Sequence, residues 1–362
     1  MNKEICIGKK ILGVGHRTYV IAEVGSNFDG NLERAKELAW RCKKAGADAY
    51  KIQNFLAPKI VSIEGFRDLQ LAFQAKWEKP VVDVYRSAEF PREWVKELAE
   101  YCRSIDIDFF SSPYDREAVD LLEEIGVVAH KIGSGEIDNL EFLKKVAKSG
   151  KPVIVGVGAA TLAEIKTAVA AVRATGNNKL VLLQCVTNYP SPIADANVRA
   201  MVEIGKECDA LYGYSDHTIG PQAGGDDPLD GLTIPLAAAA LGACIIEKHV
   251  TDDPGRKGPD HPFAMTIDGN FTKMICSIRA MEKALGDGKK RLMDSEREAV
   301  VIQRRGIYAK CSIKAGETFT APALEYLRPA VGLRLSEIAT LIGKRAARDI
   351  PAGAPITRKD FL

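Results

Sequence analysis

The stretch PVIVGVGAATLAEIKTAVAAVRATGNNKLVLLQC (152–185) decides the fold. It begins with a short apolar run, continues with apolar residues at i, i+3, i+4 and i+7, and ends with a second apolar run. This pattern is typical of a strand, an amphipathic helix and a second strand. Strands that are apolar throughout are expected in parallel sheets covered by helices on both faces. The stretch therefore predicts one β-α-β unit of an α/β fold.

The same unit recurs along the chain. Strands are predicted at 18–25, 48–53, 107–112, 129–134, 152–158, 180–185, 211–215 and 244–249, with helical patterns between them. Eight such units in about 250 residues is the count of a (β/α)8 TIM barrel. An open doubly wound sheet is the rival, but no G-x-G-x-x-G follows the first strand. We therefore predict a TIM barrel.

The two ends of the chain differ from this repeat. The opening EICIGKKILG (4–13) alternates around a Gly-Lys-Lys turn and predicts a hairpin at the floor of the barrel. After about residue 284 a polar, charged segment leads to short strands and glycine turns with two similar phrases, SIKAGETFT and DIPAGAPIT. The predicted division is a catalytic barrel over 1–284, a linker over 285–302 and a small β-rich domain over 303–362.

Composition excludes several classes of function. The 50 Lys and Arg residues nearly balance 48 Asp and Glu, and no basic run occurs, which argues against a nucleic-acid partner. The charged start MNKEICIGKK lacks a signal segment, and no apolar run approaches the roughly 20 residues of a membrane helix. Eight scattered cysteines, several within apolar runs, indicate buried free thiols. We therefore expect a cytoplasmic protein that binds neither membrane nor nucleic acid.

Polar side chains follow nearly every predicted strand. Active sites of TIM barrels lie at the carboxyl ends of the strands, so these residues should meet at one rim. The candidates are Glu23, Lys51, Gln53, Ser111, Ser112, Lys131, Ser134, Glu136, Thr187, Asn188, Tyr189, Ser215, Asp216, His217, Lys248 and His249.

Two histidines end neighbouring strands, in YSDHT (214–218) and IIEKHVT (245–251). One histidine alone would suggest a structural hydrogen bond, but two neutral imidazoles facing each other suit a divalent ion with open positions. Asp216 and Glu247 are either groups near that metal or a helix cap and an outward-facing charge.

Two lysines lie on apolar strands, where an unpaired ammonium group would be costly. Lys51 and Lys131 are therefore expected to form ion pairs or to bind an anionic ligand. The Gly-Ser-Gly sequence at 133–135 offers backbone N–H groups and a hydroxyl beside Lys131, which suits a phosphate. A metal, two lysines and a carboxylate together suggest a phosphorylated substrate and a polarised carbonyl.

At these positions the sequence resembles the sialic acid synthase family, barrels that condense phosphoenolpyruvate with a sugar. The resemblance runs through the barrel in order, and the tail resembles the SAF (antifreeze-like) domain through IKAGE (313–317) and YLRP (326–329). The barrel phrases are IAEVGSN (21–27), KIQ (51–53), FSSPYD (110–115), KIGSGE (131–136), NYPSP (188–192), YSDHT (214–218), EKHVTD (247–252) and KGPDH (257–261).

The resemblance implies a transferase that joins phosphoenolpyruvate to an open-chain N-acetylated aldose, such as N-acetylmannosamine, and releases phosphate by C–O cleavage. His217 and His249 would bind Mn²⁺, with Mg²⁺ or Co²⁺ as alternatives. Arg328 would enter the barrel of the second subunit in a homodimer with exchanged tails. Glu23, Lys51 and Lys131 would be catalytic, and substrate binding would fall to Gln53, Ser112, Ser134, Glu136, Thr187, Asn188, Tyr189, Ser215, Asp216, Asp260 and Arg328.

The chain also departs from the family pattern. Phe28 stands where the family usually has histidine in N-H-x-G, GVG (156–158) replaces S-T-G, and Gln184 replaces a common histidine. The loop 222–233 is long and acidic. The acceptor therefore stays open among N-acetylmannosamine and the precursors of legionaminic, pseudaminic or spore-coat-type sugar acids.

Two other classes of function are alternatives to a sialic acid synthase. A non-catalytic sugar-binding barrel would not need both lysines, both histidines and Glu23. A 3-deoxy-octulosonate- or heptulosonate-type synthase is disfavoured by the SAF-like tail and by the lack of an arginine cluster for a sugar phosphate. The excursion 55–92 is expected to cover the site, with Trp77 either stacking on the sugar or packing within the loop.

Overall fold

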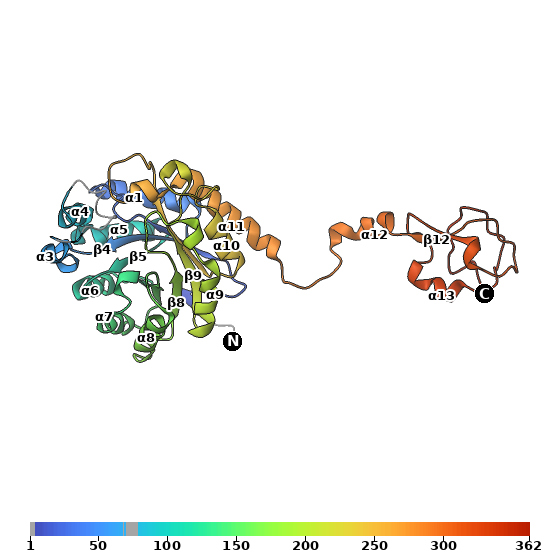
Figure 1. Cartoon of the computed structure of the whole chain (residues 1–362), viewed down its shortest axis with the longest axis horizontal. Coiled ribbons are helices and arrows are strands. Elements are labelled where there is room, and N and C mark those ends of the chain that lie inside the picture. The colour runs from blue at the N-terminus through green and yellow to red at the C-terminus, as the bar shows by residue number, and fades with distance from the viewer. Residues whose placement is uncertain (1–3, 68, 70–78) are drawn as a thin grey trace. The chain divides into compact units, whose positions relative to one another are not determined.

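The computed structural model describes residues 4–67, 69 and 79–362 and divides the chain into two compact units, Met1–Gly286 and Asp287–Leu362 (Figure 1). Trp77 lies outside the described residues, so its predicted role stays a prediction. The first unit is an α/β barrel, and the second is a small unit of short strands and turns.

Eight parallel strands form the barrel. They are β3 (Tyr19–Glu23), β4 (Ala49–Asn54), β5 (Asp108–Pro113), β6 (His130–Ile132), β7 (Val153–Gly156), β8 (Leu180–Gln184), β9 (Leu211–Asp216) and β10 (Ile245–Thr251). Their order is β5-β4-β3-β10-β9-β8-β7-β6, and β5 and β6 at its two ends lie next to each other. The sheet thus forms a nearly closed barrel, which confirms the predicted fold class. Each predicted strand lies within two residues of an observed one at both ends.

Helices cover the outside of this barrel (Figure 1). Several begin at a side-chain cap: Asn31 accepts a hydrogen bond from the backbone of Arg34, and Thr161 forms a capping box with Glu164. The helices are α1 (Leu32–Ala45), α5 (Arg92–Ser104), α6 (Arg116–Glu124), α7 (Leu140–Ala147), α8 (Leu162–Arg173), α9 (Val198–Glu207), α10 (Thr233–Ala240) and α11 (Thr272–Leu285), with α2 (Ala57–Ile60), α3 (Ile63–Arg67) and α4 (Val81–Ala88) in the excursion after β4.

The predicted hairpin at the floor of the barrel is confirmed. Strands β1 (Glu4–Ile7) and β2 (Lys10–Gly13) pair antiparallel. Lys10 Nζ donates to the Asp48 carbonyl at 2.9 Å and to Asp108 Oδ2 at 3.0 Å, and these residues stand at the amino ends of β4 and β5. The hairpin therefore lies at the end of the barrel opposite the carboxyl rim.

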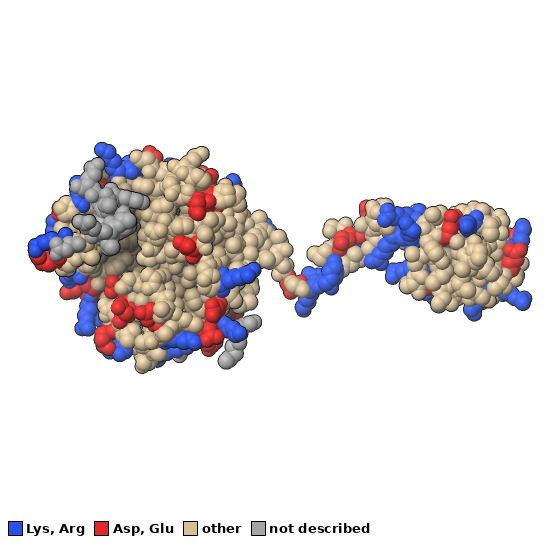
Figure 2. Space-filling model, in the orientation of Figure 1, with Lys and Arg blue, Asp and Glu red and all other residues tan. Residues whose placement is uncertain are grey.

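Charge is distributed differently over the two units. Basic and acidic side chains are interspersed on the barrel face in Figure 2. In the described part of the chain, no helix combines the length and apolar character needed to cross a membrane. Residues 287–362 hold 15 Lys and Arg against 9 Asp and Glu, so residues 1–286 hold the remaining 35 against 39. The second unit is thus basic at +6 and the first slightly acidic at −4.

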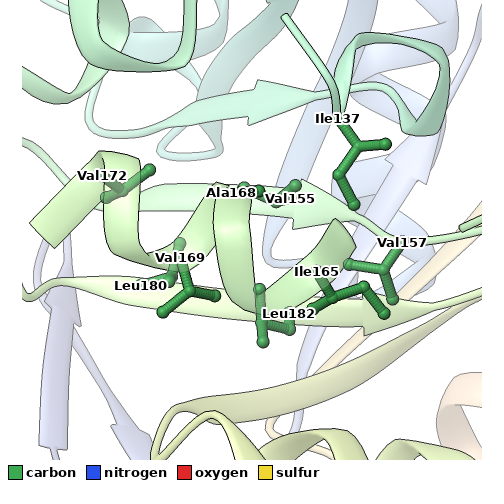
Figure 3. A pocket seen from close by; sticks show the side chains of 9 residues that line it. All are labelled: Ile137, Val155, Val157, Ile165, Ala168, Val169, Val172, Leu180 and Leu182. Carbon is green, nitrogen blue, oxygen red and sulfur yellow. The ribbon is translucent and has the colours of Figure 1, made fainter. Parts of the chain in front are cut away.

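Apolar side chains between α8 and strands β7 and β8 leave a small gap (Figure 3). Ile137, Val155, Ile165, Val169 and Leu182 are among the residues that line it, and the gap has no room for a water molecule. It is part of the packed core between sheet and helices.

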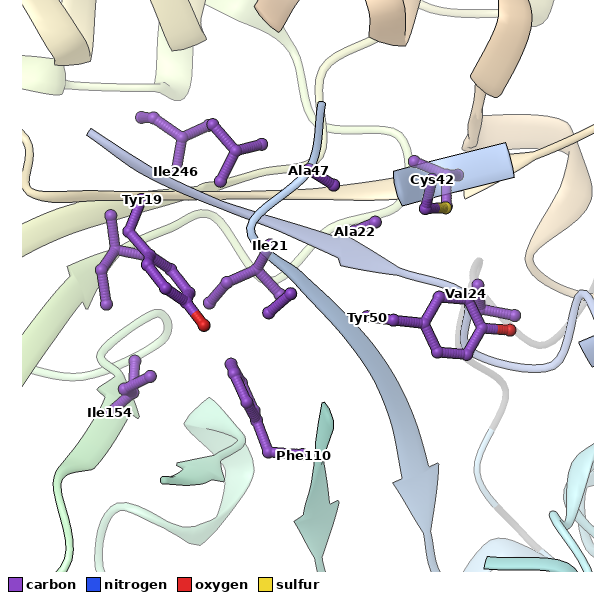
Figure 4. Close-up of a cluster of buried hydrophobic side chains, with 14 of the residues drawn as sticks. Tyr19, Ile21, Ala22, Val24, Cys42, Ala47, Tyr50, Phe110, Ile154 and Ile246 are labelled. Carbon is purple, nitrogen blue, oxygen red and sulfur yellow. The ribbon is translucent and has the colours of Figure 1, made fainter. Parts of the chain in front are cut away.

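The barrel core has an inner and an outer layer because side chains alternate along each strand. Figure 4 shows Tyr19, Ile21, Phe110 and Ile154 gathered together, while Tyr50 lies apart from them beside Val24. The Tyr50 hydroxyl donates to the carbonyl of Ala35 in α1 at 2.9 Å. The interior below the rim is therefore filled mainly by apolar side chains.

The second unit has its own core, which includes Ile307, Phe319, Leu341 and Ile356. The two phrases noted in the sequence pair here, because Ile313 and Ile350 exchange backbone hydrogen bonds of 2.9 and 2.8 Å. The regular elements are α12 (Arg297–Gln303), β12 (Gly306–Ala309), β13 (Leu324–Leu327) and α13 (Ile338–Leu341).

Candidate active site

Strand register brings the predicted residues together at the carboxyl rim. His249 on β10 lies level with Glu23 on β3, and Glu23 lies level with Lys51 on β4. One step below, Glu247 on β10 lies level with Ser215 on β9. Because alternate side chains share a face, 247 and 249 both point into the barrel.

Four buried charges form the centre of the site. Lys51 forms an ion pair with Glu23, and its Nζ lies 3.8 Å from Glu247 Oε2. Lys131 Nζ reaches Glu247 Oε1 at 3.4 Å. All four side chains are at least nine-tenths buried. Two ammonium groups and two carboxylates therefore balance each other in a space with little water.

Neutral groups complete this cluster. Ser112 Oγ accepts from Lys51 Nζ at 3.1 Å, and Ser215 Oγ donates to Glu247 Oε1 at 3.0 Å. Glu23 Oε1 accepts from the backbone of Gly25 at 2.8 Å and from Gln53 Nε2 at 3.3 Å. Among the described residues, Glu23 Oε2 and Glu247 Oε2 are buried and interact with Lys51 through ion pairs alone.

Burial and charge act in opposite directions on these carboxyls. Burial raises the pKa of Glu23 above its usual range, although the Lys51 ammonium group opposes the rise. Burial would also raise the pKa of Glu247, but Lys131 and Lys51 together hold it below its usual value. Glu247 is therefore the carboxylate that stays ionised between the two lysines.

Both predicted metal ligands lie at the rim beside this cluster. The rings of His217 and His249 are 5.6 Å apart between centroids, and both side chains are buried. Burial lowers the pKa of the His217 imidazole to about 4 and that of His249 well below its usual value. The two imidazoles are therefore neutral near pH 7, as metal ligation requires.

The hydrogen bonds of these rings fit a metal site. His217 Nδ1–H donates to the carbonyl of Val186 at 2.6 Å, which leaves its Nε2 with a free lone pair. His249 Nδ1 is buried and has no partner among the described residues. In that part of the chain no third His, Cys, Asp or Glu joins them, so a bound ion would keep positions open for water or substrate.

A serine and two glycines shape the other side of the rim. Ser134 Oγ accepts from the backbone N–H of Gly158 at 3.0 Å and lies 3.1 Å from Cys185 Sγ. A Cβ at Gly156 would come within 2.8 Å of Ser134 Oγ. A Cβ at Gly158 would come within 2.4 Å of Thr187 Oγ1. The GVG sequence thus leaves room for the two hydroxyl groups.

Five aromatic residues near the charged cluster form what we term the aromatic collar: Phe55, Tyr85, Tyr114, Tyr189 and Phe263. Phe55 directly follows β4, and its ring centroid lies 5.6 Å from that of Tyr85 and 5.8 Å from that of Tyr114. Tyr189 contacts the rings of His217 at 4.2 Å and Phe263 at 5.1 Å. Tyr85 belongs to α4, so the excursion 55–92 contributes to the collar, as expected of a segment that covers the site.

Asp260 joins the loops that follow β10 and β3. Its Oδ2 accepts from the backbone N–H of Ser26 at 2.7 Å and from the Ser26 hydroxyl at 2.9 Å. The next residue, His261, contacts Asp29 through Nε2 at 2.7 Å. Phe28, which lies between Ser26 and Asp29 in the sequence, is fully buried. Its ring packs against Phe90 with centroids 4.7 Å apart, so Phe28 belongs to the core.

Asp216 does not face the rim, although we predicted that it binds substrate. Strand β9 continues through Asp216, one residue beyond the predicted end, so this side chain lies on the outer face of the barrel. There it pairs with Lys248 at 2.5 Å, and both side chains are fully buried. The prediction for Asp216 is therefore wrong in its geometry.

Four predicted site residues remain: Glu136, Thr187, Asn188 and Arg328. Glu136, on the turn that begins at Ser134, is half-buried and accepts from Asn139 at 3.4 Å. Thr187 lies beside Gly158, whereas Asn188 is exposed and accepts from the backbone of Tyr189 at 3.1 Å. Arg328 lies in the second unit, and its predicted role at a barrel rim stays a prediction.

The acidic loop 222–233 uses its carboxylates for its own fold. Asp227 is fully buried and accepts from the backbone of Leu229 and from both the backbone and hydroxyl of Thr233 at the start of α10. Asp226 accepts from the backbone of Ile193 at 2.8 Å. These groups therefore stabilise the loop and the start of α10.

Comparison with known proteins places the chain in a family. The model of the NeuB family matches residues 39–290, and that of the SAF domain matches residues 304–362. The chain belongs to the NeuB family. This confirms the resemblance to sialic acid synthases and, at the level of that family, the prediction of an enzyme.

Several proteins similar to this chain are named as synthases of sugar acids. The chain is 38% identical to the N,N'-diacetyllegionaminic acid synthase of Campylobacter jejuni, over 92% of this chain and 97% of that protein. It is 32% identical to the pseudaminic acid synthase of Helicobacter pylori, over 94% and 97%. A crystal structure of the N-acetylneuraminic acid synthetase of Leptospira borgpetersenii in complex with citrate covers 83% of this chain and 96% of its own, with 32% identity and a TM-score of 0.71.

Sequence reasoning missed Glu247 as a site residue and left its direction open. A signal was present, since Glu247 and His249 are two residues apart on one strand and must share a face. It also missed Phe55, Tyr85 and Tyr114.

Proposed function

We propose that the barrel condenses phosphoenolpyruvate with an open-chain N-acetylated aldose, giving a nonulosonic acid and inorganic phosphate. The relatives named as synthases of such acids support the class of reaction. The observation that carries the proposal is the pair of buried lysines, each with a carboxylate partner, beside two neutral histidines.

Phosphoenolpyruvate would bind over Lys51 and Lys131. Its phosphate and carboxylate would take hydrogen bonds from the ammonium groups, from Ser112 and Ser134 and from nearby backbone N–H groups. Glu23 and Glu247 already balance the two lysines, so the incoming anion competes with them for the ammonium groups. A divalent ion at His217 and His249 would supply two further positive charges.

The reaction forms one carbon–carbon bond and one carbon–oxygen bond, the latter to water, and breaks the carbon–oxygen bond to phosphate. The C3 carbon of phosphoenolpyruvate attacks the aldehyde carbon of the acceptor, and the aldehyde oxygen takes up a proton. Water adds to the cation left at C2 and loses one proton; the C2–O bond to phosphate then breaks while the new C2 hydroxyl loses its proton, which leaves the keto acid and inorganic phosphate. Glu23, held by Gly25, Gln53 and Lys51, is the carboxylate positioned to stabilise the cation and direct that water.

Mn²⁺ is the proposed metal, with Mg²⁺ or Co²⁺ as alternatives. Held by His217 and His249, it would polarise the acceptor aldehyde as a Lewis acid. The Val186 carbonyl fixes the His217 tautomer for that task.

The aromatic collar bears on the identity of the acceptor. Tyr114 and Tyr189 are among its partly exposed members. A partly exposed ring offers apolar surface to an acetamido methyl group. Together with the relatives named as synthases of legionaminic and pseudaminic acids, this supports the precursors of those acids over N-acetylmannosamine as the acceptor.

A homodimer with exchanged tails stays part of the proposal. The basic composition of residues 287–362 and the acidic composition of the barrel unit support an association between copies. Light scattering on the full chain tests the dimer. Arg328→Ala tests the predicted contact, because it should raise KM for the acceptor without changing dimer mass.

The test of the reaction is phosphate release from phosphoenolpyruvate with Mn²⁺ across a panel of N-acetylated aldoses. Oxygen-18 in the bridging position distinguishes the cleaved bond, because C–O cleavage leaves the label in phosphate. Ser112→Ala should lower turnover, whereas Ser111→Ala is the matched control, since Ser111 donates to the Ile52 carbonyl and faces away. EDTA and His217→Asn should abolish turnover.

Two results would count against the proposal. If the chain bound neither Mn²⁺ nor phosphoenolpyruvate, the synthase function would be refuted. If both bound but no aldose reacted, the N-acetylated acceptor class would be refuted.

A further inference from the structure

A buried ion pair lies directly behind the two histidines. Asp216 and Lys248 stand level on neighbouring strands, with the side chains of both residues completely shielded from solvent. Each precedes a histidine in sequence, so the ion pair and the two imidazoles lie on opposite faces of the same two strands. The ion pair therefore faces away from the interior of the barrel.

Both members of the pair also bind the turn after His217. Lys248 Nζ donates to the carbonyl of Thr218 as well as to Asp216 Oδ2. Asp216 accepts from the Thr218 backbone N–H at 3.1 Å and from its hydroxyl at 3.0 Å. The backbone on both sides of His217 is therefore tied to the strand that carries His249.

The covering loop excludes water from this pair. Gly231 has φ +83°, and a Cβ there would lie 3.1 Å from Lys248 Nζ and 3.0 Å from the Thr218 carbonyl. Any larger residue would be strained and would press on the ammonium group. The close approach gives the ion pair a low-dielectric surrounding in which its hydrogen bonds are strong.

His249 depends on this arrangement more than His217 does. The Val186 carbonyl holds the ring of His217, but Nδ1 of His249 has no hydrogen-bond partner among the described residues. Only ring packing and the backbone of β10 therefore place His249. The backbone ladder already joins β10 to β9, and the Lys248–Asp216 ion pair adds a side-chain link between the two chain segments one residue before each histidine.

We propose that Asp216 and Lys248 are positioning residues that set the placement of His217 relative to His249. The inference rests on the proposed function only for the metal, because the placement of the two rings can be measured without one. The pair acts through the backbone and touches neither substrate nor ion.

The test compares Lys248→Met with the wild-type full chain by two readouts. Lys248→Met keeps the length of the side chain and removes the charge. The chain has five histidines, so histidine-selective ¹³C labelling gives five ring signals without metal. We expect the signals of His217 and His249 to shift or broaden and those of the other three to stay. Mn²⁺ titration should show a fall in affinity of about 10- to 100-fold.

A matched control separates positioning from stability. Arg279→Met breaks an ion pair with Asp48, 3.3 Å long, at the start of β4 on the opposite end of the barrel. It should lower Tm but leave both histidine signals and Mn²⁺ affinity unchanged. Asp216→Asn, which keeps the size of the side chain, replaces Lys248→Met if that variant does not fold.

The outcomes are distinct. If Lys248→Met lowers Tm but leaves the His217 and His249 signals where they are in the wild type, the proposal is overturned and the pair is merely structural. If the wild type binds no Mn²⁺, the metal site of the proposed function fails, and the ring signals alone still decide the positioning role.

Discussion

Replacing Glu247 by glutamine tests the charge balance of the site. The carboxylate lies 3.4 Å from Lys131 Nζ and 3.8 Å from Lys51 Nζ. At an effective dielectric constant near 20, each attraction is roughly 4–5 kcal/mol before the cost of burying the carboxylate is subtracted. Because glutamine removes both terms, we expect a net loss of about 3 kcal/mol in the free energy of unfolding. The corresponding fall in Tm is about 6–10 °C.

The same variant should bind anions more tightly. Glu247→Gln leaves one lysine charge without a carboxylate, so inorganic phosphate no longer competes with Glu247. We expect phosphate affinity to rise about tenfold, or ~1.4 kcal/mol. Phosphate should therefore raise the Tm of the variant more than that of the wild type. Thermal unfolding with increasing phosphate and calorimetric titration give the two quantities.

Glu136→Gln is the matched control because Glu136 is a half-buried carboxyl near the rim that does not pair with either lysine. It should change stability by less than about 0.5 kcal/mol. The charge-balance reasoning would be refuted if Glu247→Gln unfolded at the wild-type temperature and bound phosphate no more tightly.

Two further predictions concern pH and packing. Because burial lowers the pKa of His217 to about 4, between pH 6.5 and 4 the unfolded chain binds a proton that the folded chain does not, so stability falls as pH falls. From pH 6.5 to 5.0 this loss of stability amounts to about 1.6 kcal/mol. His217→Asn should lose that much less in urea unfolding, and equal losses would contradict the prediction. Gly156→Ala should displace Ser134 Oγ, because that atom would lie 2.8 Å from the new Cβ, and should weaken phosphoenolpyruvate binding about tenfold. Gly135→Ala is the control, since the space around its Cβ is open, and should leave the affinity unchanged. Calorimetric titration measures both affinities, and equal values would refute the prediction.

The fold was predictable because its signals are local. Apolar runs, separated by stretches of helical periodicity, mark every barrel strand within two residues. The rim residues followed from the rule that strand ends converge. This rule placed Glu23, Lys51 and His249 at one rim, and the strand register shows that they lie level with one another.

The errors in the site arose where one residue of strand length decides a direction. Asp216 was expected at the rim because the strand was ended at 215, but β9 includes 216 and turns that side chain outward. Tyr85 could not be predicted because it reaches the rim from α4, whose position depends on tertiary packing. Glu247 was left open because its partners, Lys51 and Lys131, are distant in sequence.

That distance has a consequence for how the chain assembles during synthesis. Glu247 leaves the ribosome 196 residues after Lys51 and 116 after Lys131, the two lysines whose charge it balances. Until β10 arrives, burying both ammonium groups would leave Lys131 without its carboxylate partner, a costly state. The nascent barrel is therefore expected to stay open and hydrated at its centre. Insertion of the last strand then both closes the cylinder and supplies the missing charge, so closure and creation of the site become a single event.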